Sequence, residues 1–237
     1  ILFTRIFPKS IFQCEVFQET NKNILIDGIE IFKEFLVITE RNNGLKKMKL
    51  YPFESRKETY IEFNEETYYL GLGVNDDYHT NTLFYSYNSL TTPSSIFKYD
   101  MMSGEQTLWH QKKVLDPSFS SDNYESQRIW ATANDGTQVP ISIVYKKGTK
   151  LSEAPCLLYG YGSYGYTIPD YFSATRLSLL DRGFVFATAH IRGGKYMGEE
   201  WYQNGKFLKK INTFTDFINA AEYMGHMGFC DPNKIYA

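Results

Sequence analysis

The sequence predicts two architectures in series, an antiparallel β region followed by an α/β region. Short runs of aromatic and β-branched residues, separated by turn signals, fill the first half, whereas strand and helix patterns alternate in the second. With 237 residues the chain is long enough for one large domain or two small ones. We therefore predict two domains, residues 1–115 and 116–237.

The first half is predicted to be a meander of short strands. Turn signals such as Asn43-Gly44 and Ser103-Gly104-Glu105 fall between the runs. A sandwich, a barrel and propeller blades all fit, because each protects the edges of short antiparallel strands. The strands are expected at residues 24–32, 35–39, 45–51, 67–72, 82–87, 95–99 and 106–109.

The second half opens with a predicted hairpin of residues 127–133 and 138–145. Asp135-Gly136 lies between the two runs and supplies the positive φ that a tight primed turn requires. Strands and helices then alternate, which predicts a parallel, doubly wound sheet. The remaining elements are expected as strands at 155–159, 184–189 and from Lys234, and as helices at 172–180 and from Thr213.

The last of these helices has a predicted start and a predicted buried face. Thr213 stands where an N-cap is expected, and Asp216 follows three residues later to close a capping box. The apolar residues at helical spacing are Phe214, Phe217, Ile218 and Ala221, which predicts that this face packs against the sheet.

The composition excludes several classes of function. Lys and Arg total 25 and Asp and Glu 27, without a dense basic run, so a nucleic-acid partner is not expected. No stretch approaches the ~18 apolar residues of a membrane span. The four histidines lack metal spacing, and we expect neither a metal nor another cofactor. Three widely spaced cysteines suit neither a disulfide framework nor a zinc site, which indicates a reducing compartment.

A glycine-rich segment follows the predicted strand at 155–159. Gly160, Gly162 and Gly165 match the dinucleotide fingerprint in form, but no helix opens inside the motif. The next strand ends at His190 without the carboxylate that would hold a ribose. A turn that shapes a pocket at the carboxyl ends of the strands is the better interpretation.

Several long motifs in register resemble the prolyl oligopeptidase family, from about residue 24 to residue 237. The first half contains two of them, and its resemblance to the last blades of that family's β-propeller favours the propeller among the three options. The second half resembles the first part of the family's α/β-hydrolase domain. The motifs are Thr80–Ser94, Tyr99–Glu105, Arg128–Pro140, Leu158–Gly165, Leu179–Phe184, Ala189–Gly194, Gly198–Trp201 and Phe207–Phe217.

The resemblance implies a cytoplasmic serine peptidase that cuts short peptides after Lys or Arg, with the propeller covering the active site. In this family the nucleophile lies on a Gly-x-Ser-x-Gly elbow after the strand that begins here at Lys234, and the Asp and His of the triad follow. The sequence contains no Gly-x-Ser-x-Gly. We therefore expect an internal part of such an enzyme, inactive by itself, whose partners are short peptides and the remainder of the parent chain, with no membrane involved.

The resemblance also assigns roles to individual residues. Tyr161 aligns with the tyrosine whose hydroxyl donates to the oxyanion, and a phenol keeps its proton at neutral pH. Asp170 stands in a loop where some members carry acidic residues that bind a second basic side chain. Arg192, Gly193 and Gly194 are expected to build a structural loop, with the guanidinium tying segments together.

Two alternatives stay open at this point. One is another hydrolase of the same superfamily, such as a dipeptidyl or acylaminoacyl peptidase or an esterase. The motif Tyr87–Pro93 disfavours this alternative. The other is a binding module derived from a propeller, without catalytic function.

Overall fold

The computed structural model describes residues 2–3, 15–16 and 24–237. In its first half, two antiparallel sheets contain four strands each. Each sheet is a meander in which neighbours along the chain pair, as in a propeller blade. The first contains β3 (Ile24–Ile31), β4 (Phe35–Asn42), β5 (Leu45–Pro52) and β6 (Thr59–Tyr60). The second contains β7 (Tyr68–Leu72), β8 (Thr82–Ser89), β9 (Ser95–Asp100) and β10 (Gln106–Gln111).

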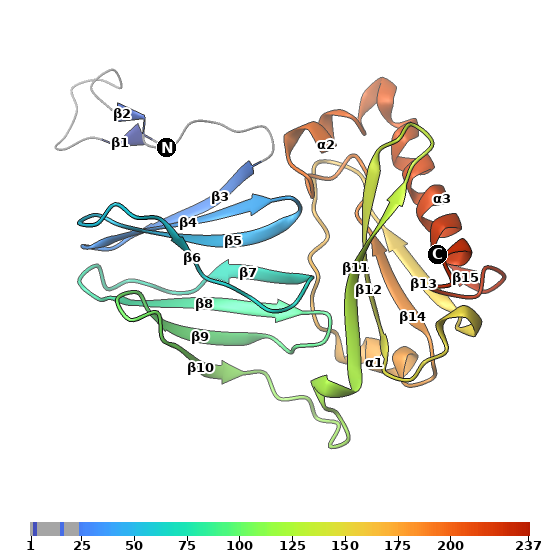
Figure 1. Cartoon of the computed structure of the whole chain (residues 1–237), viewed down its shortest axis with the longest axis horizontal. Helices are drawn as coiled ribbons and strands as arrows, with labels where there is room; N and C mark the ends of the chain where they lie inside the picture. The colour runs from blue at the N-terminus through green and yellow to red at the C-terminus, as the bar shows by residue number, and fades with distance from the viewer. Residues whose placement is uncertain (1, 4–14, 17–23) are drawn as a thin grey trace.

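All seven strands predicted for this half are present, and the two-residue β6 is an addition. Near residue 1, β1 (Leu2–Phe3) pairs antiparallel with β2 (Glu15–Val16). The two blades lie one over the other (Figure 1) and share one apolar core. Stacked rings of Tyr85 and Phe97, with centroids 5.5 Å apart, fill part of it. Aromatic residues are frequent in this half because flat rings pack well between sheets.

The second half is a five-stranded mixed sheet of order β11-β12-β14-β13-β15. β13 pairs parallel with β14 on one side and with β15 on the other. The strands are β11 (Tyr124–Thr132), β12 (Gln138–Lys146), β13 (Cys156–Gly160), β14 (Val185–Ala189) and β15 (Ile235–Tyr236). The helices are α1 (Ala174–Leu180), α2 (Glu199–Gln203) and α3 (Ile211–His226), with short 3-10 turns η2 (Ser121–Asn123), η3 (Leu151–Glu153) and η4 (Phe207–Lys209).

The two longer helices cover opposite faces of this sheet, as a doubly wound fold requires. Leu177 and Leu180 of α1 join a cluster with Val144 of β12. Ala220 and Met224 of α3 join a different cluster, which includes Ile143 and Leu158. Since Ile143 and Val144 are consecutive in a strand, they point to opposite faces. A doubly wound sheet therefore follows the two antiparallel sheets, as predicted.

The predicted start of α3 is wrong by a few residues. The helix begins at Ile211, so Thr213 lies inside it and is not the N-cap. The Thr213 hydroxyl donates to the carbonyl oxygen of Arg192, 2.8 Å away, and Asp216 accepts from Arg192 instead of closing a capping box. Tertiary partners thus use both side chains, which the local capping pattern does not reveal.

The predicted buried face of α3 is wrong in part. Phe217 and Ala221 pack against the core cluster of the sheet, whereas Phe214 and Ile218 are 58 % and 54 % exposed. Large apolar side chains of η4 and the start of α3 are also exposed. Together they form an apolar surface, Phe207, Leu208, Ile211, Phe214 and Ile218. Exposed apolar surface of this kind is typical of contact surfaces in folded proteins.

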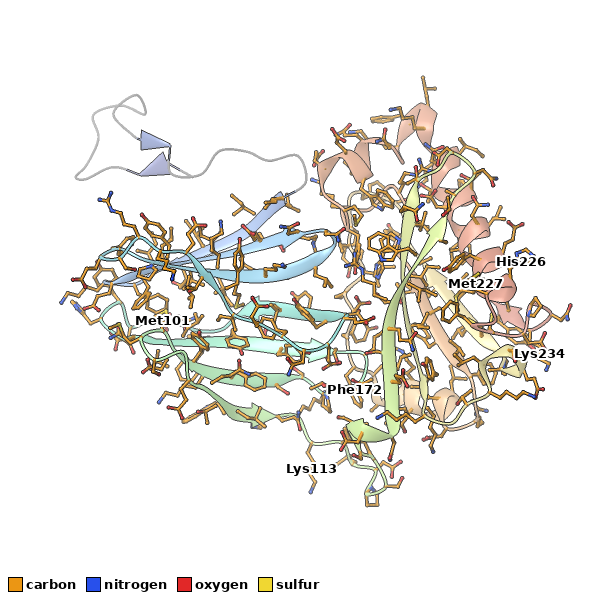
Figure 2. All side chains as sticks on the ribbon, in the orientation of Figure 1. Met101, Lys113, Phe172, His226, Met227 and Lys234 are labelled. Carbon is orange, nitrogen blue, oxygen red and sulfur yellow. The ribbon has the colours of Figure 1, made fainter. Side chains whose placement is uncertain are left out.

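The predicted boundary between residues 115 and 116 falls in the connection from β10 to β11. In Figure 1 the blades and the mixed sheet lie side by side, with β11 and β12 facing the blades. Phe172, labelled in Figure 2, lies where the two halves meet, and its N–H donates to Asn88 Oδ1 of β8 at 2.8 Å. Within the described part of the chain, no helix is long and apolar enough to cross a bilayer.

Candidate active site

Two loops meet at the carboxyl ends of the parallel strands, the place where α/β sheets bind ligands. One loop follows β13 and runs over residues 161–173, and the other follows β14 and begins at His190. The Gly165 N–H donates to the Gly193 carbonyl oxygen at 3.0 Å, which joins the two loops. We call the first of them the tyrosine loop, because it carries Tyr161, Tyr164, Tyr166 and Tyr171.

Glycine is required where these loops touch. A Cβ on Gly162 would lie 2.4 Å from the Arg192 carbonyl oxygen, and one on Gly193 would lie 2.0 Å from the Gly162 oxygen. Gly193 also has a φ of +99°, a conformation that side chains disfavour. Gly194 packs as closely, since its Cβ would lie 2.6 Å from the Tyr166 oxygen. The glycines therefore serve close backbone packing of the two loops.

Tyr161 lies on the open side of this packing. Its side chain is 39 % exposed, and its ring meets Tyr166 edge to face at 5.9 Å between centroids. Tyr161 lines a cavity of about 340 Å³ together with Lys210 and Phe214. The Tyr161 phenol thus lies at the rim of a cavity, on backbone fixed by glycine contacts. Its role as a donor to the oxyanion stays a prediction.

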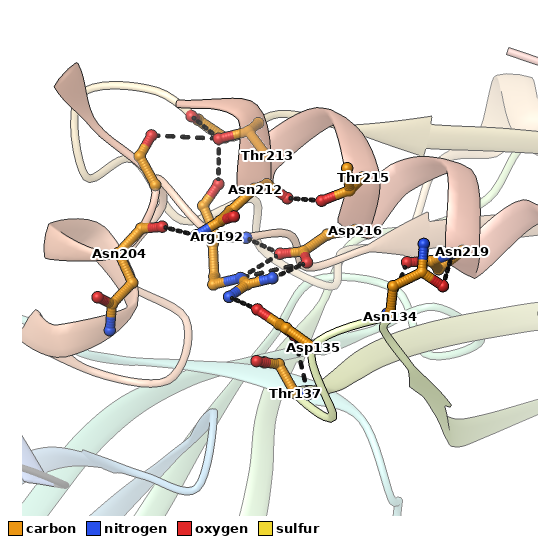
Figure 3. A network of polar contacts seen from close by, with 12 residues as sticks. Asn134, Asp135, Thr137, Arg192, Asn204, Asn212, Thr213, Thr215, Asp216 and Asn219 are labelled. Carbon is orange, nitrogen blue, oxygen red and sulfur yellow. Dashed lines mark hydrogen bonds and ion pairs between the residues drawn. The ribbon is translucent and has the colours of Figure 1, made fainter. Parts of the chain in front are cut away.

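Arg192 anchors the loop after β14 to α3 and to the hairpin (Figure 3). Its guanidinium binds the fully buried carboxylate of Asp216 through two nitrogens, with Nη2–Oδ1 at 2.6 Å and Nε–Oδ2 at 2.9 Å. The Arg192 backbone N–H donates to the same carboxylate at 3.0 Å. Nη1 donates to Asp135 Oδ2 at 2.6 Å, and this bond lowers the pKa of Asp135 to about 2. Arg192 thus joins three segments and does not face the cavity.

Two residues of the α3 region hold the tyrosine loop from the other side. Lys210 Nζ donates to the Gly162 carbonyl oxygen and, at 2.8 Å, to Ser163 Oγ. Thr213 Oγ1 donates to the Arg192 oxygen, and it lies 3.4 Å from the Gly162 oxygen. Local sequence patterns predict no role for Lys210 and only a capping role for Thr213. The motif Phe207–Phe217, which contains both residues, is the signal that could have identified them.

Asp170 is buried, and its carboxylate is engaged by protein groups. Ser142 Oγ donates to Asp170 Oδ2 at 3.0 Å, and His190 Nε2 lies 3.6 Å from Oδ1. The side chains of Asp170 and His190 are both buried from solvent. Substrate binding by Asp170 stays a prediction, and direct contact with a peptide is not possible in the conformation that the structure shows.

Ser142, His190 and Asp170 include the residue types of a catalytic triad, but their geometry does not serve nucleophilic attack. The single Ser142 proton goes to Asp170, so His190 Nε2, 2.8 Å from Ser142 Oγ, acts as the donor of that pair. A nucleophilic serine needs the opposite arrangement, with the histidine accepting its proton. All three residues are also buried away from the cavity beside Tyr161.

Two meander sheets that pack beside a doubly wound sheet, with the tyrosine loop at its carboxyl edge, have the architecture of a β-propeller next to the start of an α/β-hydrolase domain. Family profiles agree: "Prolyl oligopeptidase, N-terminal beta-propeller domain" matches residues 9–112 and "Prolyl oligopeptidase family" matches residues 170–237. The chain belongs to the prolyl oligopeptidase family of serine peptidases.

Individual relatives carry different names. The chain is 39 % identical to dipeptidyl aminopeptidase BI of Pseudoxanthomonas mexicana, over 91 % of this chain and 30 % of that protein. It is 34 % identical to protease 2 of Moraxella lacunata, over 92 % of this chain and 31 % of that protein. It superposes on oligopeptidase B from Trypanosoma brucei with covalently bound antipain with a TM-score of 0.85 at 34 % identity, covering 96 % of this chain and 33 % of that one. The chain thus spans about a third of the length of these relatives.

Proposed function

We propose that this chain is part of a cytoplasmic serine endopeptidase of the oligopeptidase B type, which hydrolyses short peptides after Lys or Arg. The similarity to oligopeptidase B carries the proposed type. The parallel pairing of β13 with β15, in the register Cys156↔Ile235 and Leu157↔Tyr236, supports the proposed position of the nucleophile. Residues that follow two neighbouring parallel strands emerge at the same edge of the sheet. A nucleophile elbow after β15 would therefore stand beside the tyrosine loop.

In this proposal the roles are divided between the chain and the rest of the enzyme. Tyr161 donates its hydroxyl hydrogen bond to the oxyanion that forms on the scissile carbonyl. The nucleophilic Ser, the triad His and the triad Asp come from residues beyond Ala237, and the blades restrict access to short peptides. The same remainder of the enzyme covers the exposed apolar surface of η4 and α3.

The cysteines support the proposed compartment. Cys156 and Cys230 are buried free thiols, while Cys14 lies outside the described residues. A hydrogen bond with Cys230, together with burial, raises the pKa of Cys156, so this thiol stays protonated and unreactive. Buried free thiols of this kind suit the cytoplasm.

A second candidate is a dipeptidyl aminopeptidase, because the relative with 39 % identity carries that name. The two activities differ in their need for a free amino terminus on the substrate. We expect the whole enzyme, of which this chain is proposed to be a part and which we call the longer enzyme, to cleave an amino-terminally blocked Arg-Arg amide. Cleavage only of substrates with a free amino terminus would favour the dipeptidyl aminopeptidase, and cleavage of neither would favour a binding module.

The chain by itself is expected to have no peptidase activity, because an oxyanion donor does not replace a nucleophile and its base. The measurement is turnover of a fluorogenic Arg-Arg amide, together with mass spectrometry after treatment with a serine-directed phosphonofluoridate. We expect no turnover and no label on Ser142. A labelled Ser142, or turnover that the reagent blocks, would show that the nucleophile lies within these residues.

The apolar surface of η4 and α3 is expected to make the isolated chain self-associate. Replacing Leu208 and Phe214 by Ser should reduce the association seen by light scattering after size exclusion, because both side chains are exposed. Leu115→Ser is the matched control, since Leu115 is exposed in the connection between the two halves. A chain that is monomeric at all concentrations would contradict this expectation.

A further inference from the structure

A buried polar cluster joins the two halves of the molecule. It consists of Ser142 of β12, Asp170 of the tyrosine loop, His190 after β14, and Thr67 just before β7 of the propeller. Thr67 Oγ1 donates to Ser142 Oγ at 3.1 Å, and Ser142 Oγ donates to Asp170 Oδ2 at 3.0 Å. Thr67 and Ser142 are fully buried and the other two are nearly so. We call these four residues the Asp170 cluster.

The protons of the cluster run in one direction, toward Asp170. Ser142 has a single hydroxyl proton and gives it to Asp170, so Thr67 and His190 both donate to the serine oxygen. Burial raises the pKa of Asp170, but the neighbouring His190 ring and the Thr67 and Ser142 hydroxyls outweigh this effect, and the net pKa is lowered. Asp170 is thus a buried anion that the propeller hydroxyl helps to stabilise.

The propeller seals the cluster from water. The Tyr196 ring stacks on the His190 ring, with centroids 3.6 Å apart and planes 13° from parallel. The propeller turn at Gly44 packs against Tyr196 so closely that a Cβ there would lie 2.2 Å from Cε1. The guanidinium of Arg41, also from the propeller, lies 5.8 Å from the centroid of the Tyr196 ring. If the propeller moved away, the cluster would meet water and Ser142 would lose the hydrogen bond from Thr67.

The cluster holds one end of the tyrosine loop. The end near Tyr161 is fixed within the hydrolase half, by Gly193 and Lys210. The far end is fixed by Asp170 and by the bond from the Phe172 N–H to Asn88, and this end depends on the propeller. One end of the tyrosine loop is therefore held by residues of the hydrolase half, and the other end is held in part by residues of the propeller.

We propose that Asp170 is a positioning residue that transmits contact with the propeller, through Thr67 and Ser142, to the loop that carries Tyr161. The inference rests on the proposed role of Tyr161 as the oxyanion donor. In this view the loop is held at both ends only while the propeller covers the hydrolase sheet. Asp170 does not touch the reacting atoms.

Hydrogen–deuterium exchange of the chain tests the coupling without any need for activity. Thr67→Val removes the propeller hydroxyl and keeps the shape of the side chain. We expect exchange of the peptide spanning residues 166–172 to rise about fivefold, the effect of one hydrogen bond on a local opening equilibrium, while α3 stays protected. Thr67→Ser keeps the hydroxyl and should restore the wild-type exchange.

Thr39→Val is the matched control, because Thr39 is buried in β4 and its hydroxyl has no hydrogen-bond partner among the described residues. It should leave the exchange of residues 166–172 unchanged. The coupling is overturned if Thr67→Val leaves this exchange as in the wild type, or if Thr39→Val raises it equally.

Kinetics of the longer enzyme separate the coupling from the oxyanion role. Thr67→Val should lower kcat about fivefold with KM unchanged, and Thr67→Ser should behave as wild type. If exchange rises but kcat is normal in both Thr67→Val and Tyr161→Phe, the coupling stands and the oxyanion assignment is wrong. If Tyr161→Phe lowers kcat and Thr67→Val does not, positioning through the Asp170 cluster is refuted.

Discussion

Replacing Tyr161 by Phe in the longer enzyme is expected to lower kcat by ~10² to 10³, with little change in KM. The substitution keeps the ring, its edge-to-face contact with Tyr166 and the glycine-packed backbone, and removes only the hydroxyl. The hydrogen bond strengthens as negative charge develops on the substrate oxygen, so its loss falls on the transition state more than on the bound substrate. The measurement is steady-state hydrolysis of a blocked Arg-Arg amide.

Tyr164→Phe is the matched control for this prediction. Tyr164 lies in the same loop, but it is 89 % exposed and does not line the cavity beside Tyr161. Its substitution should leave kcat nearly intact. Equal and small effects of the two substitutions, with circular dichroism unchanged, would show that another group stabilises the oxyanion.

Removing the Asp216 carboxylate is expected to have the largest effect on stability. Asp216→Ala should lower the free energy of unfolding of the hydrolase half by about 3–5 kcal/mol, because it leaves the buried Arg192 guanidinium without its main partner. Urea unfolding at low protein concentration measures this. In a Trp109→Phe background, tryptophan fluorescence reports the hydrolase half, because only Trp130 and Trp201 remain, and the Trp201 indole N–H donates to the His190 carbonyl oxygen.

Two further variants show whether the loss comes from the buried charge. Asp135→Asn changes the other partner of Arg192, but the Asp135 side chain is 47 % exposed, and an exposed pair contributes at most about 1 kcal/mol. The double variant Arg192→Met with Asp216→Leu removes both buried charges and should regain part of the stability. A loss below about 1 kcal/mol for Asp216→Ala would contradict the anchoring role of the pair.

Most strands could be predicted from the sequence, because alternation along a strand and the turn residues between strands are local properties. Asn43-Gly44 marks a tight turn, and the strands on either side of it pair in the structure. The α3 region shows the limit of such patterns. Thr213 has the residue type of an N-cap, but partners far away in the sequence, such as Arg192, determine what it bonds to.

The candidate site was predictable in the same uneven way. Tyr161 and Arg192 stand in recognisable motifs. The glycines beside them are also visible in the sequence, because close backbone packing requires glycine. The partner of Arg192 on α3 left no such signal, because Asp216 looks like an ordinary residue at a helix start. Asp170 had the right residue type for binding a basic side chain, yet the structure buries it against Ser142 and His190.

The sequence by itself determined the order of the two architectures, the positions of their strands, the family and the loop that carries Tyr161. Only the tertiary structure decided which residues hold that loop, how the propeller reaches it through Thr67, and which side of α3 stays exposed. The physical reason is the range of the interactions. Periodicity and turn chemistry act between neighbours in the chain, whereas a buried anion such as Asp170 depends on partners from segments that only folding brings together.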